Sequence, residues 1–307
     1  WSAALDKLQQ ELKARGNSML MVTDSLRGHL GTVVSQFTQS LGGRYMTFDA
    51  LDNATYRGAI KGVFGQDLMP DFDFANTRFL LSFGADFLST WVSPTRWNIG
   101  YGEFRSGEGK ERGTFYHADS RFSMTAASAD KWLPIEPGYE GHLAMSVAYV
   151  IISENLQAPG VDVGTLTGGQ GAAALEAFRP EAMAARVFLS GSMRGEEGVE
   201  TIRHLAREFA GKTPSLAIGG GSAGAQTNGL FNLKAIYALN YLVGSVAAEG
   251  GIRFNPGSPL DNASASAPSG TLNDWIRVKQ DLDSGAINMM LLRQANPVYG
   301  LPDQLRF

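Results

Sequence analysis

Apolar positions along this chain alternate between the period of a helix and the short runs of buried strands. Leucines recur at spacings of three and four between Ser2 and Arg15, which predicts a helix there. The apolar run Met19–Val22 that follows predicts a buried strand. A second helical stretch spans Leu26–Leu41 and ends at two glycines. The chain thus begins as helix, strand, helix.

The same alternation continues to the end of the chain. Further helices are predicted at Thr55–Phe64, Glu140–Ser153, Val199–Phe209 and Leu230–Ala247. Further strands are predicted at Phe79–Phe83, Thr114–His117, Val187–Leu189, Leu216–Ile218 and Ile287–Leu292. Loops are expected at Pro159–Gly171 and Asn255–Gly270, where glycine, proline and small polar residues gather. Strands that alternate with helices predict an α/β fold with parallel sheets and helices on both faces.

Composition narrows the class of protein. The 307 residues are 44% hydrophobic and 18% charged, as in folded proteins, and at about 150 residues per domain they suggest two domains. The net charge of −4 argues against nucleic acid as a partner. The chain has no cysteine, which excludes a disulfide framework, a thiolate zinc site, a thiol nucleophile and an iron–sulfur cluster bound by this segment.

The two ends of the chain resemble internal cuts. The sequence starts at Trp1 with no basic segment and apolar core of a signal peptide, and it stops in a loop at Phe307. No run approaches the roughly 18 apolar residues that a membrane span needs. We therefore expect a part of a longer protein, without a transmembrane segment in this chain.

Glycines follow several predicted strands, at Gly84, Gly191 and Gly219–Gly221. Ligands of parallel sheets bind beyond the carboxyl ends of the strands, so these loops are candidate binding sites. Residues 219–224 have the G-x-G-x-x-G spacing, but the acidic residue of a plain NAD site is missing about 20 positions later. A hydrolase elbow around Ser222 is rejected, because all four histidines precede it. A tight strand-to-helix connection remains an equally good explanation.

Charged residues stand at the same strand ends. Asp119 and Arg121 follow one strand and Asp86 follows another, where they could recognise a polar ring and a phosphate or simply form an ion-paired turn. Glu140 begins a helix and could serve only the helix dipole. The four histidines are scattered without the spacing of a metal site.

Together, these segments resemble the large subunit of the molybdopterin oxidoreductase (complex iron–sulfur molybdoenzyme) superfamily. The matching segments are Phe79–Trp91, Ser93–Arg96, Gly113–Ala144, Gly219–Gly229 and Ala295–Pro302. The block Asp119–Gly141, with its A-D-K-W-L-P-I-E-P-G run, is the most specific of them. The resemblance implies two α/β domains, one of them discontinuous. We place the discontinuous domain at residues 1–49 and 180–307 and an inserted Rossmann-like domain at residues 50–179.

The resemblance also implies site residues. In active family members, these loops hold pyranopterin guanine dinucleotides. By that comparison Asp119 and Arg121 would face a nucleotide, Glu140 would replace an aspartate that binds guanine, and Asp86 would line the cleft. The residues near a second pterin would be Gly219, Gly221, Ser222 and Asn228, with Asn296 nearby. Asp52 stands near the position where many members have a cysteine that ligates molybdenum.

Within the superfamily, residues 81–88 and 296–302 look most like the molybdoenzyme-like portion of alternative complex III, which is fused there to an iron–sulfur portion. That likeness implies a cofactor-free scaffold portion of a respiratory quinol-oxidising complex, with no catalytic residue and no metal in this segment. Iron–sulfur clusters would lie elsewhere in the parent chain or complex. The partners would be iron–sulfur, haem c and quinol-oxidising membrane subunits, at the periplasmic or outer face of the cytoplasmic membrane.

Two alternatives of other classes remain open. One is an active bis-pterin molybdenum oxidoreductase, in which Asp52 ligates the metal and the nine residues named above bind molybdopterin guanine dinucleotide. A single carboxylate is a weaker argument than a cysteine for such a soft site. The other is an α/β protein that binds a small anion.

Overall fold

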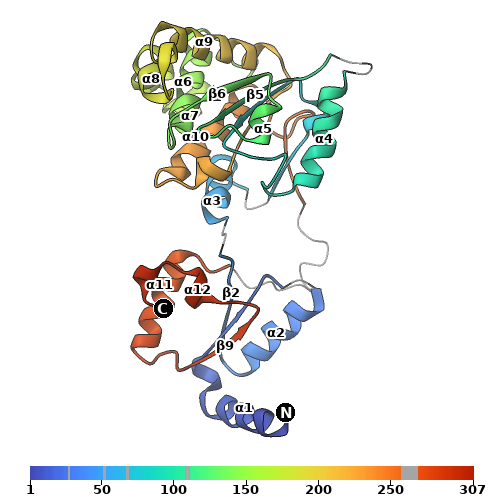
Figure 1. Cartoon of the computed structure of the whole chain (residues 1–307), viewed down its shortest axis with the longest axis vertical. Coiled ribbons are helices and arrows are strands. Elements are labelled where there is room, and N and C mark those ends of the chain that lie inside the picture. The colour runs from blue at the N-terminus through green and yellow to red at the C-terminus, as the bar shows by residue number, and fades with distance from the viewer. Residues whose placement is uncertain (27, 51–52, 67–68, 108, 110, 257–268) are drawn as a thin grey trace. The chain divides into compact units, whose positions relative to one another are not determined.

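A computed structural model describes residues 1–26, 28–50, 53–66, 69–107, 109, 111–256 and 269–307 of the chain (Figure 1). The chain divides into two compact units. Unit 1 consists of Trp1–Ala54 and Gly257–Phe307, and unit 2 is Thr55–Pro256. Among the described residues, no helix is both long and apolar enough to cross a membrane.

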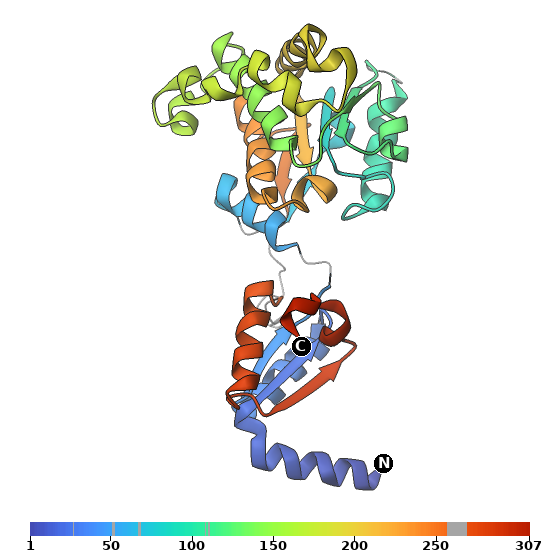
Figure 2. The same cartoon turned by 60° about the vertical axis from the view of Figure 1, so that its left-hand side comes forward.

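Unit 1 is built on a three-stranded parallel sheet in the order β2-β1-β9. Its elements are α1 (Ser2–Arg15), η1 (Gly16–Ser18), β1 (Met19–Thr23), α2 (Gly28–Ser40), β2 (Arg44–Thr47), α11 (Leu272–Asp283), β9 (Met289–Arg293), α12 (Pro297–Gly300) and η6 (Asp303–Leu305). Helices α2 and α11 lie on opposite sides of the sheet (Figures 1 and 2). Leu20 and Val22 of β1 pack with Trp275 and Val278 of α11 to form the core of this unit.

Unit 2 contains a four-stranded parallel sheet in the order β6-β5-β4-β7 and a small antiparallel pair, β3-β8. Its strands are β3 (Pro70–Phe72), β4 (Phe79–Phe83), β5 (Thr114–Asp119), β6 (Lys131–Pro134), β7 (Ser215–Gly219) and β8 (Ile252–Phe254). Its α-helices are α3 (Ala54–Phe64), α4 (Pro94–Ser106), α5 (Met124–Ala127), α6 (Glu140–Ser153), α7 (Val163–Thr167), α8 (Pro180–Val187), α9 (Glu196–Gly211) and α10 (Gly229–Leu242). Short 3₁₀ helices are η2 (Phe74–Asn76), η3 (Gly171–Phe178), η4 (Gly191–Arg194) and η5 (Gly221–Gly224). The predicted α/β class, with parallel sheets between helices, is confirmed.

The central strand of unit 2 is apolar because it is covered on both faces. All five residues of β4 are buried, and Leu80 lies opposite Phe115 of β5 and Leu216 of β7. Continuous apolar runs are typical of parallel strands between two helix layers.

Side chains close the outer edge of β7. Asn240 of α10 accepts a hydrogen bond from the Ala217 N–H and donates one to the Ala217 carbonyl, both at 2.8 Å. The Tyr237 hydroxyl donates to the Gly219 carbonyl at 2.6 Å. Without such partners, the outward-facing backbone N–H and carbonyl groups of an edge strand would be left unpaired. Within the described part of the chain, no further strand pairs with β7.

The predicted strand at Val187–Leu189 is wrong. Helix α8 continues through Val187, and Phe188 makes only an isolated bridge to Ile135. Met183, Ala184 and Val187 repeat at helical spacing and are buried, and so short an apolar run does not distinguish helix from strand. Gly191 consequently begins η4 and follows no strand.

Two other segments differ from the prediction. The expected loop Pro159–Gly171 contains the short helix α7, which Asp162 caps by accepting a hydrogen bond from the Gly164 N–H at 2.8 Å. Helix α10 ends at Leu242 and does not reach Ala247. Most of the expected loop Asn255–Gly270 lies outside the described residues.

The domain boundary expected at residue 180 also differs from the division of the structure. Residues 180–256 belong to unit 2, because β7 pairs with β4 along its whole length and α10 packs on β7. Strand pairing between distant segments leaves no trace in local hydrophobic periodicity. A pattern along the sequence therefore does not locate this boundary.

Candidate functional site

The carboxyl ends of β4, β5 and β7 bring four of the predicted site residues together in unit 2. Asp86 follows β4, and its carboxylate accepts hydrogen bonds from the Arg121 guanidinium at 2.9 Å and from the Thr125 hydroxyl. Asp119 ends β5 and accepts hydrogen bonds from the Arg121 backbone N–H at 3.2 Å and from the Ser222 hydroxyl at 3.4 Å. The strands are parallel, so these ends meet at one edge of the sheet.

Asp119 is held as a buried carboxylate. Asp119 is only 2% exposed, and its Oδ2 atom lies 3.5 Å from Nε2 of His117, which is also buried. Burial alone would raise the pKa of Asp119, but the His117 imidazole and the Arg121 backbone N–H outweigh it. The pKa of this carboxyl therefore lies below its ordinary value.

Glu140 is connected to the same edge through Asn232. Glu140 is fully buried at the start of α6, and its Oε2 atom accepts a hydrogen bond from Asn232 Nδ2 at 3.1 Å. The Asn232 side chain also donates to the Ala223 carbonyl and accepts from the Gly141 N–H. Oε1 of Glu140 has no partner among the described residues. Burial, with the nearby Asp119 carboxylate adding to it, raises the pKa of Glu140.

We expect Glu140→Gln to stabilise the protein in a pH-dependent manner. Folding favours the protonated form of Glu140, because its pKa in the folded state lies above the unfolded value. The stabilisation from that proton is complete below the unfolded pKa and is lost as the pH rises through the folded pKa. Glutamine keeps an acceptor for Asn232 and removes the charge. The Tm of E140Q should exceed that of the parent at pH 8, and the two should converge near pH 4.

Thermal unfolding from pH 4 to pH 8, followed by circular dichroism, measures this difference. The matched control is Glu197→Gln, which makes the same change at an exposed position near the start of α9. A Tm difference for E140Q that does not change with pH, or a loss of stability at pH 8, would contradict the assignment.

Glycine loops at the strand ends pack directly against each other. A Cβ atom on Gly84, whose φ is +62°, would lie 2.3 Å from the Ser222 hydroxyl oxygen and 2.7 Å from the Ala223 nitrogen. A Cβ atom on Gly220 would lie 2.0 Å from the indole nitrogen of Trp91. The loops after β4 and β7 are therefore in contact, with an aromatic side chain beside them.

Three of the remaining predicted residues lie near the carboxyl end of β7, and one lies in unit 1. Gly219 ends β7 under the Tyr237 hydroxyl, Gly221 begins η5 with φ of +53°, and Asn228 donates a hydrogen bond to the Gly138 carbonyl at 2.8 Å. Asn296 belongs to unit 1, where it caps α12 by accepting from the Tyr299 N–H. Asp52 lies outside the described residues. Among those that are described, no three His, Asp or Glu residues cluster as a metal site.

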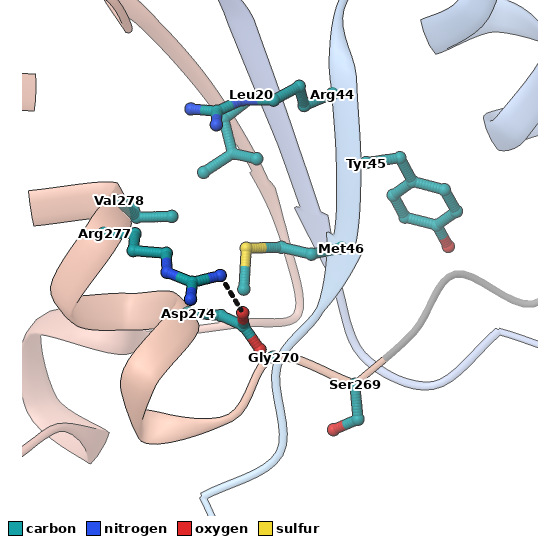
Figure 3. Close-up of a pocket in the computed structure, with 9 residues that line it drawn as sticks. All are labelled: Leu20, Arg44, Tyr45, Met46, Ser269, Gly270, Asp274, Arg277 and Val278. Carbon is teal, nitrogen blue, oxygen red and sulfur yellow. Dashed lines mark ion pairs between the residues drawn. The ribbon is translucent and has the colours of Figure 1, made fainter. Parts of the chain in front are cut away.

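Unit 1 holds a pocket of about 380 Å³ between the edge of its sheet and α11 (Figure 3). Leu20, Met46 and Val278 form an apolar side of it. Arg277 lies 3.9 Å from Asp274, and Arg44 pairs with Asp281 at 2.7 Å. Both arginines that line the pocket are thus paired with acids. Of the predicted site residues that the structure describes, none lines this pocket.

Three residues that contact the predicted site residues of unit 2 were not themselves predicted from the sequence. They are Asn232, Thr125 and Trp91. Asn232 interrupts the apolar face of α10 and is fully buried, and a buried asparagine in a helix needs hydrogen-bond partners. That signal could have identified Asn232. Trp91 and Thr125 carried none, since aromatic and hydroxyl residues are ordinary in loops and short helices.

Known proteins share both the sequence pattern and the fold of this chain. No protein-family profile matches it. The menaquinone reductase, molybdopterin-binding-like subunit of Nitratidesulfovibrio vulgaris is 26% identical over 314 aligned residues, which cover 100% of this chain and 43% of that subunit. The probable dimethyl sulfoxide reductase chain YnfF of Escherichia coli is 28% identical over 281 residues, covering 82% of this chain and 34% of that protein. The molybdopterin-containing arsenate respiratory reductase subunit of Chrysiogenes arsenatis is 30% identical over 207 residues, covering 62% and 24%.

The relatives of this chain are subunits of the molybdopterin oxidoreductase superfamily. The resemblance drawn from residues 79–144, 219–229 and 295–302 is confirmed at that level. Acetylene hydratase from Pelobacter acetylenicus shares the fold, with a TM-score of 0.63 and 21% identity over 83% of this chain and 34% of the hydratase. The chain spans less than half the length of these relatives.

Proposed function

We propose that this chain is a cofactor-free, molybdoenzyme-like scaffold portion of a quinone-linked respiratory complex, of the kind found in alternative complex III. Its partners would be iron–sulfur, haem c and quinol-oxidising membrane subunits at the outer face of the cytoplasmic membrane. Any iron–sulfur clusters would lie outside these 307 residues, which contain no cysteine. The observation that carries the proposal is the close packing of the loops and buried carboxylates at the carboxyl ends of β4, β5 and β7.

The residues at this edge do not fit a pterin guanine dinucleotide in their present arrangement. Guanine recognition needs a carboxylate that can reach the ring, yet Glu140 is 0% exposed and its Oε2 atom is bonded to Asn232. Asp119 is 2% exposed and already accepts several hydrogen bonds. The contact between the Gly84 and Ser222 loops leaves no space for a phosphate between them. Most hydrogen bonds of these carboxylates thus go to groups of the chain itself, and only Oε1 of Glu140 is left without a partner among the described residues.

The comparisons support the same proposal. The relative whose alignment covers all of this chain is named a molybdopterin-binding-like subunit of a menaquinone reductase, so a quinone-linked protein is among its relatives. The dimethyl sulfoxide and arsenate reductase subunits favour the alternative, an active molybdenum oxidoreductase. The two functions differ in whether molybdenum and pterin are bound.

Cofactor analysis of the native complex that contains this chain separates the two functions. Molybdenum and tungsten are measured by mass spectrometry, and pterin by fluorescence after acid oxidation. The scaffold proposal expects amounts far below one metal atom per chain. A purified dimethyl sulfoxide reductase with its bound molybdenum cofactor provides the positive control. One metal atom and pterin per chain would overturn the proposal.

An exposed arginine gives a second test that does not depend on the metal content. The side chain of Arg121 is 67% exposed and pairs with Asp86, so its loss should cost little stability. If no nucleotide binds here, Arg121→Met leaves the quinol oxidation rate of the complex within about twofold of the parent. Arg44→Met, at another exposed arginine paired with an aspartate, is the matched control. A drop of tenfold or more with R121M alone would favour the active enzyme.

A further inference from the structure

Cationic side chains from three connections of unit 2 meet at the amino ends of its parallel strands. Arg78 immediately precedes β4, Arg112 lies two residues before β5, and Lys212 lies between α9 and β7. They line one pocket of about 220 Å³, together with Glu111, Thr114 and Gly211. The candidate site lies at the carboxyl ends of the same strands, so this pocket is a separate feature of the opposite edge of the sheet.

The charges that line this pocket do not cancel. Its lining contains the three cations and a single carboxylate, that of Glu111, so positive charge is in excess. The chain as a whole has a net charge of −4, and the excess is therefore local. Like charges that are held near one another repel, and an anion placed among them is stabilised. The pocket thus favours a negatively charged ligand.

The acids beside the two arginines neutralise them only in part. Arg78 pairs with Glu111 at 3.1 Å, but both side chains are more than half exposed, and such surface pairs contribute little. Arg112 pairs with Asp130 at 3.1 Å. The Asp130 carboxylate also accepts hydrogen bonds from the Arg105 guanidinium, one of them at 2.8 Å, so one carboxylate is shared by two arginines. Arg78 and Arg112 can therefore bind an additional anion.

Lys212 and Thr114 bring further hydrogen-bond donors to the pocket. Nζ of Lys212 lies 2.6 Å from Oε2 of Glu208 and donates a hydrogen bond to the Thr114 hydroxyl oxygen at 3.3 Å. Among the described residues, these contacts use two of the three N–H donors of the ammonium group. The Thr114 hydroxyl accepts from Lys212 and can donate its own hydrogen. Such donors suit the oxygen atoms of phosphate or sulfate.

We propose that this pocket binds a small, doubly charged oxyanion of the phosphate class, held by Arg78, Arg112 and Lys212. The pocket is smaller than the roughly 300–1,000 Å³ of sites for drug-sized ligands, so the ligand is a free ion or the phosphate group of a small ester. The Glu111 side chain is 71% exposed and turns into solvent when the anion binds. This site is independent of the proposed scaffold function, because no residue of the candidate site takes part in it.

Isothermal titration calorimetry of the full chain with inorganic phosphate, at constant ionic strength, tests the pocket. Arg78→Met, Arg112→Met and Lys212→Met should each weaken binding by about tenfold or more, because each removes a charge-assisted hydrogen bond. Arg44→Met is the matched control, since Arg44 is 55% exposed and paired with an aspartate but belongs to unit 1. It should leave the dissociation constant within about twofold of the parent. Titration with glycerol 3-phosphate tests a phosphate ester in the same way.

Gly211 allows a second test that leaves all three cations in place. Its φ is not in the left-handed region, and a Cβ atom there would have nothing within 4 Å, so a side chain can be added. Gly211→Asp brings a carboxylate to the pocket and should abolish phosphate binding. Gly211→Asn has nearly the same shape without the charge, and it should bind phosphate within about threefold of the parent.

Three outcomes would overturn the proposal. If neither phosphate nor glycerol 3-phosphate bound to the parent chain, the cations would form only a network of surface ion pairs. If Arg44→Met weakened binding as much as the pocket variants did, the anion would be held by the general charge of the surface. If Gly211→Asp and Gly211→Asn bound phosphate equally well, the anion would bind at another place on the chain.

Discussion

Replacing Asn240 by leucine is expected to lower the free energy of unfolding of unit 2 by about 3–5 kcal/mol. The side chain of Asn240 is fully buried and makes both hydrogen bonds to the backbone of Ala217, at 2.8 Å each. Leucine has a similar volume and fills the space, but it leaves a buried N–H and a buried carbonyl without partners. Each such group costs about 1–3 kcal/mol. The outer edge of β7 would lose the partner that replaces a neighbouring strand.

Urea unfolding of the full chain, followed by circular dichroism and tryptophan fluorescence, measures this loss. Asn98→Leu is the matched control, because Asn98 makes its two backbone hydrogen bonds at the surface, where water replaces them. We expect the control to change stability by less than about 1 kcal/mol. Similar losses in both variants would show that the edge of β7 does not depend on Asn240.

Gly84→Ala should destabilise the protein by about 2–4 kcal/mol, because it combines backbone strain with a steric clash. The φ of +62° at this residue is unfavourable for alanine, and the new Cβ atom would overlap the Ser222 hydroxyl oxygen and the Ala223 nitrogen. The clash exists only if the loops after β4 and β7 are closed on each other, as the cofactor-free proposal requires. Equilibrium unfolding in urea measures this loss in the free energy of unfolding.

Gly191→Ala separates the two contributions. Gly191 has a similar φ of +70°, but nothing lies within 4 Å of the position of its Cβ atom. The control should therefore lose only the strain energy, about 1–2 kcal/mol. If Gly84→Ala were no more destabilising than Gly191→Ala, the two loops would be able to part, and the alternative with a bound dinucleotide would gain support.

The candidate site could be predicted in part because parallel sheets collect their strand ends at one edge. Asp86, Asp119 and Ser222 each follow an apolar run that the sequence identifies as a strand, so their meeting follows from the fold class. Asn232 is different, because its role depends on α6 and α10 lying side by side. Those two helices are about ninety residues apart, and no local pattern encodes their contact.

The sequence by itself determined the α/β class, the positions of the strands β1, β4, β5, β7 and β9, and the resemblance to the superfamily, but it did not predict β2, β6, α4 or α11. These features rest on short-range periodicity and on motifs, which are properties of neighbouring residues. Only the tertiary structure decided that residues 180–256 join unit 2, that Val187 ends a helix, and that Glu140 and Asp119 are turned inward. Such outcomes depend on pairing and burial between distant segments, where each polar group must find a partner once water is excluded. At the expected ligand site, burial places Asp119 and Glu140 beside hydrogen-bond donors of the chain itself, namely Ser222 and Asn232.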